Sequence, residues 1–170
     1  VVFEKEKHAF DCVNYSTVMN QLGKQALAGQ TQHITQHPQF ISFLDSLADI
    51  IVERGFGWIG VRQTANVIHA MAKMGVCNGG AKRILDWISN EENAQQFIAR
   101  AENTQEVANV AWALATLGTP APLFFAKLDA GSDWFVKNAN PQEVAKVAWA
   151  FAKLDTPAPV FLAKLDAESD

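Results

Sequence analysis

Polar side chains recur at one spacing in the chain, and their types suit contacts with the bases and phosphates of a nucleic acid. Gln105, Asn109 and Thr116 lie four and then seven residues apart. An amide side chain can donate and accept hydrogen bonds together, as a base edge requires, whereas lysine and arginine can hold a phosphate. Residues of these kinds recur at matching positions elsewhere: Gln142, Lys146 and Lys153; Arg62, Asn66 and Lys73; and Asn14, followed by Gln21.

These polar residues belong to an internal repeat with a period of 37 residues. Residues 103–133 align without a gap onto residues 140–170; of the 31 aligned positions, 8 differ and 23 are identical. Periods of 20–50 residues are typical of solenoids, in which each unit buries its apolar face against a neighbour. Three of the eight differences fall on or beside the polar stripe, a pattern that indicates a constant scaffold with a variable surface.

Each repeat is expected to contain two helices. In the first of the two, Asn103 is a favourable N-cap, and Glu106 follows three residues later as in a capping box. Apolar residues then recur at helical spacing until Gly118, which favours a helix end. Pro122 is suited to the first turn of a second helix, and the apolar stretch 134–136 leads back to the next cap.

Two more divergent copies are visible upstream. Residues 62–75 align with residues 105–118, and His69 replaces the tryptophan of the later copies. A weaker match begins at Asn14, where Met19 and Gly23 correspond to Met71 and Gly75. The sequence therefore predicts an all-α protein, an α-solenoid of stacked helical hairpins in one array over residues 1–170. Its expected units are approximately 8–60, 61–102, 103–139 and 140–170, the last of them incomplete.

The stretches "EVANVAWALATLG" and "EVAKVAWAFAKLD" resemble the first-helix signature of octotricopeptide-type repeats, which are related to repeats of RAP-domain and FAST-kinase-like proteins. The resemblance is close over residues 103–170 and fair over residues 62–75. It implies an α-solenoid that binds single-stranded RNA in organellar RNA processing, stability or translation. It also implies an intracellular location, in a mitochondrion or a chloroplast. The expected RNA contacts are the stripe residues Asn14, Arg62, Asn66, Lys73, Gln105, Asn109, Thr116, Gln142, Lys146 and Lys153.

The charge of the chain leaves a second function open. The formal net charge is −4, whereas proteins that bind nucleic acid by charge alone are usually basic. The acidic residues of the last two units lie mostly in the expected second helix and its exit, so the stripe itself is neutral to basic. The alternative is a protein-binding α-solenoid scaffold or assembly subunit without nucleic acid, with the partner on the concave face. A merely solvated helix face would also account for the stripe.

Large aromatic residues of the repeats are interpreted as core. Trp112, Trp134, Trp149 and Phe124 could stack on bases, but each falls within an apolar pattern at helical spacing. Packing inside the solenoid is the interpretation that this pattern favours.

Other motifs do not lead to catalysis or metal binding. "GFGWIG" (residues 55–60) fits a dinucleotide-binding fingerprint, but a predicted helix precedes it, so it is interpreted as an interhelical link. His33 and His37 lie four residues apart without a third ligand nearby, and the two cysteines form no CxxC pair. No catalytic arrangement is recognisable, so we expect no enzyme, no cofactor and no metal. Because no apolar run approaches roughly 20 residues, no membrane insertion is expected.

Overall fold

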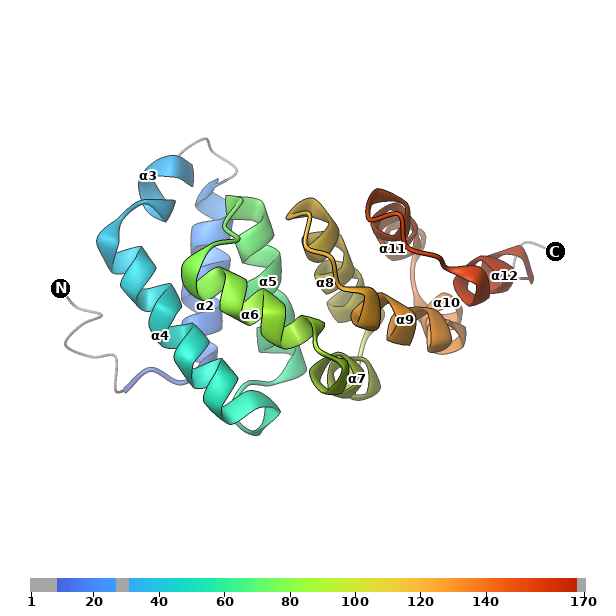
Figure 1. Cartoon of the computed structure of the whole chain (residues 1–170), viewed down its shortest axis with the longest axis horizontal. Helices are drawn as coiled ribbons and strands as arrows, with labels where there is room; N and C mark the ends of the chain where they lie inside the picture. Colours follow the sequence, from blue (N-terminus) through green and yellow to red (C-terminus); the bar gives the residue numbers. More distant parts are fainter. Residues whose placement is uncertain (1–8, 27–30, 168–170) are drawn as a thin grey trace. The chain divides into compact units, whose positions relative to one another are not determined.

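The computed structural model describes residues 9–26 and 31–167, and these residues form helices and connecting turns without a β-strand. The predicted all-α class is therefore confirmed. The chain divides into two compact units, Val1–Trp87 and Ile88–Asp170 (Figure 1). None of the described helices is long and apolar enough to cross a membrane.

The first unit is built around two long helices that pack against each other. Its elements are α2 (Cys12–Gln25), α3 (Thr31–Thr35), α4 (Pro38–Arg54), the 3-10 helix η3 (Gly55–Gly57), α5 (Val61–Met74) and the start of α6 (Gly79–Ser89). α2 packs along α5 (Figure 1). Tyr15 of α2 is buried. Its ring makes edge-to-face contacts with Phe10 and Trp58 and a tilted contact with Phe43.

Helix α4 precedes the "GFGWIG" segment, which confirms that this segment links two helices. Pro38 is the first residue of α4, and the ring of His37 accepts a hydrogen bond from the backbone N–H of Gln39. The helix ends at Arg54, and the glycine-rich segment continues as η3 towards α5. A helix, and not a strand, therefore precedes the glycines, as expected.

Gly23 does not end a helix, although the sequence alignment matched it to Gly75. α2 continues to Gln25, and a Cβ atom at Gly23 would lie only 3.1 Å from the Cα of Ala70. The residue is buried at a close approach between α2 and α5. The match of Gly23 to Gly75 is wrong, because Gly23 serves helix packing and Gly75 serves helix termination.

The second unit arranges its helices in two sets. They are α7 (Glu91–Arg100), α8 (Thr104–Thr116), α9 (Pro122–Ala130), α10 (Ser132–Asn138), α11 (Pro141–Lys153) and α12 (Pro159–Ala167). α8 packs against α11, while α9 packs against α7 and α12 (Figure 1). A continuous row of ring contacts runs through this unit, from Phe97 by way of Phe124, Phe125, Phe151 and Phe161 to Phe135.

The helix starts of the second unit agree with the sequence. Asn103 caps α8 by accepting a hydrogen bond from the N–H of Glu106, and Asn140 caps α11 through a complete capping box with Glu143. Pro122 is the first residue of α9, and Pro159 holds the same place in α12. The predicted caps and proline starts are confirmed.

The repeat has one helix more than the sequence predicted. The stretch that was expected to lead back to the next cap forms a third, short helix, α10. Its Phe135 is fully buried and contacts Phe161, while Trp134 is 38% exposed. With seven residues the helix is too short for a periodic apolar pattern, which is why its type could not be recognised from sequence.

Three helices end in the same backbone turn. The residues that follow α5, α8 and α11 adopt positive φ angles: 67° at Gly75, 62° at Gly118 and 50° at Asp155. In each turn the next N–H donates to the carbonyl five residues earlier: Val76 to Met71, Thr119 to Leu114 and Thr156 to Phe151. This is the Schellman motif, and it confirms the predicted helix end at Gly118.

Candidate functional site

An open groove lies on the two packed helices α8 and α11 of the second unit. Its volume is about 520 Å³, and it is lined by Trp112, Gln142, Ala145, Lys146 and Trp149. Two of these five residues, Gln142 and Lys146, belong to the polar stripe predicted from sequence. The groove therefore brings stripe residues together with two large aromatic side chains.

Trp112 and Trp149 lie on the face of the stripe, and Trp149 is a surface residue and not a core residue. Trp149 is 43% exposed, and Trp112 is half-buried. The prediction of core packing is therefore wrong for Trp149 and Trp134, which are both exposed, and correct for the fully buried Phe124. The Trp149 ring faces outward because Trp149 follows Gln142 by seven residues and Lys146 by three. These spacings place all three residues on one helix face.

That spacing could have identified the tryptophans from sequence. The stripe occupies positions i, i+4 and i+11 of the first helix in each of the last two repeats, and tryptophan occupies i+7, the position that completes the same face. Residue type led to the core assignment, whereas residue position indicated the surface.

Two equivalent stripe residues are bonded to each other. The amino group of Lys146 donates a hydrogen bond of 3.0 Å to Oδ1 of Asn109, and both residues are half-buried. Asn109 was expected to pair with a base edge by donating and accepting together. In the structure its oxygen accepts from Lys146, so Asn109 can contact a ligand through its amide NH₂ or through the second lone pair of that oxygen.

The remaining stripe residues of this unit are accessible. Gln105, Thr116, Gln142 and Lys153 are all exposed on the helices that carry the groove. Gln142 lies in the first turn of α11 and Lys153 is its last residue, so amide and ammonium groups flank the tryptophan along the helix.

The two lysines of the stripe on α11, Lys146 and Lys153, make no ion pair with a described residue, whereas the other lysines of this unit do. Lys127 pairs with Glu91, and Lys137 and Lys164 both pair with Asp133. Hydrogen bonds from Lys164 and Lys137 lower the pKa of the Asp133 carboxyl from its usual value. Among the described residues no carboxylate lies within 4.0 Å of Lys146 or Lys153. The positive charges on α11 are thus not neutralised by direct ion pairs.

Helix α5 of the first unit carries the corresponding residues. Arg62, Asn66 and Lys73 occupy the second, sixth and thirteenth places of α5, as their counterparts do in α8 and α11. Arg62 is exposed, and Asn66 and Lys73 are half-buried. His69, at the place of the tryptophan, is also half-buried.

Asn14 does not share this place, which corrects the sequence alignment. It is the third residue of α2, where its side chain accepts from the N–H of Asp11 and completes a capping box. The N-cap Asp11 sets the start of α2 three residues later than the alignment required. The side-chain oxygen of Asn14 is used in the cap and does not belong to the stripe.

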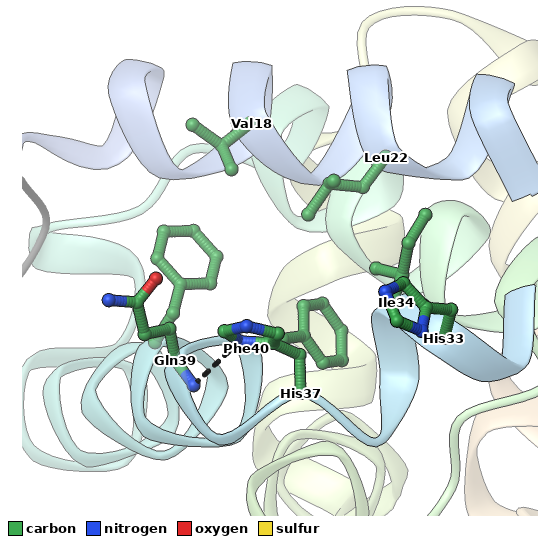
Figure 2. Close-up of a pocket in the computed structure, with 8 residues that line it drawn as sticks. Val18, Leu22, His33, Ile34, His37, Gln39 and Phe40 are labelled. Carbon is green, nitrogen blue, oxygen red and sulfur yellow. Dashed lines mark hydrogen bonds between the residues drawn. The ribbon is translucent and has the colours of Figure 1, made fainter. Parts of the chain in front are cut away.

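A second pocket lies in the first unit and is largely apolar. It has a volume of about 300 Å³ and is lined by Val18, Leu22, His33, Ile34, His37, Gln39, Phe40 and Phe43. Figure 2 shows Val18 and Leu22 pointing from α2 towards the side of Phe40 and His37. Both candidate histidines line this pocket, but the described residues contain no cluster of three histidine, cysteine or acidic side chains that could hold a metal ion.

No protein-family model, curated protein or solved structure matches the chain.

Proposed function

We propose that the protein is a helical-repeat module that binds single-stranded RNA in the groove of α8 and α11. In this proposal the repeats stack as an α-solenoid of period 37, and the module has a binding function and no catalytic one. The observation that carries the proposal is the lining of the groove, where Trp112 and Trp149 lie beside Gln142 and the unneutralised Lys146.

The tryptophans supply the sequence-tolerant part of binding. Bases of a single strand stack on exposed aromatic rings, and each such contact contributes about 1–3 kcal/mol when it is removed by alanine substitution. Trp149 has the exposed ring area that stacking requires, and Trp112 borders the same groove. Two rings on neighbouring helices can therefore hold two bases or clamp one.

The polar residues supply the backbone and edge contacts. Lys146 has two further ammonium protons besides the one donated to Asn109, and a phosphate can accept them. Lys153 extends the positive charge along α11, while Gln142 offers both a donor and an acceptor to a base edge. Since the net charge is −4, binding is expected to depend on these local contacts more than on overall attraction.

The compartment and the biological role follow only from the resemblance of the repeats. We propose organellar RNA processing, stability or translation as the setting, in a mitochondrion or a chloroplast. The amides and cations of α5, Arg62, Asn66 and Lys73, are proposed as a further contact surface of the same kind.

The direct test is a titration of labelled single-stranded RNA pools with the whole chain at two salt concentrations. Saturable binding that weakens with salt is expected, and absence of saturable binding at the lower salt concentration would contradict the proposal. Replacing Trp149 by alanine should weaken binding about tenfold, and replacing it by phenylalanine should cost less.

A pair of charge variants locates the site. Lys146→Gln with Lys153→Gln should weaken RNA binding at least tenfold and lower the slope of log affinity against log salt by about 1 to 2. Lys127→Gln with Lys137→Gln changes the net charge by the same amount on α9 and α10 and should change affinity less than twofold. Equal effects of both pairs would mean that α11 does not carry the site.

The second candidate function is a protein-binding scaffold, which the acidic net charge favours. If the chain binds no RNA and recovers one protein in stoichiometric amount after nuclease treatment, this function replaces the first.

A further inference from the structure

The two repeats of the second unit have the same sequence on one helix face but bury it differently. On α8, Ala108, Ala111 and Ala115 are fully buried, at spacings of three and four residues that place them on one face. Their counterparts on α11 are Ala145, Ala148 and Ala152, of which the first and last are exposed and the middle one is half-buried. Side-chain type is constant here, so the difference must come from what lies against each face.

The second helices of the repeats show the same contrast. Phe125 of α9 is fully buried and contacts Phe151 of the following repeat, with ring centroids 5.1 Å apart. Its counterpart on α12, Leu162, is 55% exposed. The cover of the α9 face is therefore supplied by the following repeat, whereas the corresponding apolar face of α12 is exposed at Val160 and Leu162.

One polar contact across the repeats is specific. The carboxylate of Asp129 is 9% exposed and accepts a hydrogen bond of 2.8 Å from the backbone N–H of Phe161, in the first turn of α12. α9 and its repeat counterpart begin at Pro122 and Pro159, and in α9 no side chain caps the start. Asp129 thus caps the second helix of the repeat that follows it. Its counterpart, Asp166, is exposed.

We infer that the exposed face of α11 and α12 is a docking surface for one further helical repeat of the same kind, with Asp166 as the cap for that repeat's second helix. The occupant is specified by the interface already present between α8–α9 and α11–α12, which this face continues. The docked repeat should carry alanines on its first helix. Its second helix should have first-turn N–H groups that no side chain of its own caps.

The docked repeat should also carry an amide at the sixth place of its first helix. At the existing interface that place pairs Asn109 with Lys146, an acceptor with a cation. A second lysine opposite Lys146 would place two like charges together, whereas asparagine would accept from it. The groove tryptophan stays accessible in this arrangement, because Trp112 is only half-buried although α11 covers the α8 face.

The test extends the whole chain after Asp170 with a second copy of residues 134–170, in which asparagine replaces the copied Lys146. This continues the period of 37 residues. Hydrogen exchange is measured for the amides of α11 and α12 with and without the extension. Exchange at least tenfold slower in the α12 amides is expected, together with added helical signal in circular dichroism. Exchange that slows less than threefold, or an added copy that stays unfolded, would overturn the inference.

Two matched variants make the test specific. Asp166→Ala should leave exchange within twofold in the natural chain, where the carboxylate is exposed, and should remove most of the added protection in the extended chain. The extension that keeps lysine at the copied place should give less protection than the asparagine form. If neither change alters hydrogen exchange in the extended chain, the added repeat docks elsewhere.

Discussion

Lys146 and Asn109 occupy the same place in successive repeats and are hydrogen-bonded to each other, with 3.0 Å between Nζ and Oδ1. The position that varies between the repeats is therefore also a contact between them. Replacing Asn109 by lysine would oppose two ammonium groups, whereas the natural pair joins a cation to an amide oxygen. Variation at this register consequently couples surface chemistry to repeat packing.

The first prediction concerns the strength of that bond. Asn109→Ala and Lys146→Met, made singly and together, should show a coupling free energy of about 1 kcal/mol, as for a half-buried hydrogen bond to a charged group. Urea unfolding of the four chains measures it. Strictly additive single effects would indicate that the bond does not persist in solution.

A second prediction concerns the buried cap between repeats. Asp129→Ala should lower the free energy of unfolding by about 2 kcal/mol, because the N–H of Phe161 loses its acceptor in a buried place. Asp129→Asn keeps an acceptor oxygen and should cost less. Asp166→Ala is the matched control in the natural chain and should change the stability by less than about 0.5 kcal/mol, since that carboxylate is exposed.

These contacts show which parts of the structure the sequence could predict. Caps and stops act through neighbouring backbone groups, so Asn103, Pro122 and Gly118 identify helix ends without knowledge of the tertiary fold. The bond of Asp129 to Phe161 joins residues 32 apart and becomes visible only when two helices are placed side by side.

The errors have equally local causes. Asn14 and Gly23 were aligned by residue type, but Asp11 is the N-cap of α2 and moves the helical places by three residues. Trp149 was assigned to the core because tryptophan is large and apolar, although its place in the helix lies between Lys146 and Lys153 on the exposed face. In both cases the place of a residue in its helix was a better guide to its role than its type.

The third prediction compares Gly118 and Asp155, which occupy the same place after α8 and α11. Asp155 adopts a φ of 50°, a conformation that costs an L-residue about 1 kcal/mol or more, while Gly118 holds the same place after α8. The acidic side chain also lies at the negative end of the α11 dipole. Asp155→Gly should therefore stabilise the protein by about 0.5–1 kcal/mol, and Gly118→Ala should destabilise it by a similar amount. Midpoints of urea unfolding report both, and a destabilised Asp155→Gly chain would refute the strain argument.

The fourth prediction tests a backbone approach in the first unit. A Cβ atom at Gly80 would lie 2.6 Å from the carbonyl oxygen of Leu44, closer than any real Cβ contact and against backbone that cannot turn away. Gly80→Ala should cost more than about 2 kcal/mol, although alanine favours a helix. Gly57→Ala is the control, because nothing lies within 4 Å of its Cβ position. Comparable unfolding midpoints for the two variants would show that α4 and α6 separate easily.

The last prediction concerns acid stability. The pKa of the Asp133 carboxyl is lowered first by the hydrogen bond from Lys164 and then by that from Lys137. A carboxyl whose pKa is lower in the folded state stabilises the fold above its unfolded pKa, and this contribution disappears as the pH falls through the folded pKa. Because the ion pairs are exposed, the effect should be modest and should weaken with added salt. A carbon-13 NMR titration of the Asp133 carboxyl should give a pKa below the usual value of 3.8, and Lys164→Met should raise it. If the titration is unchanged by Lys164→Met, the pair that links α10 to α12 does not form in solution.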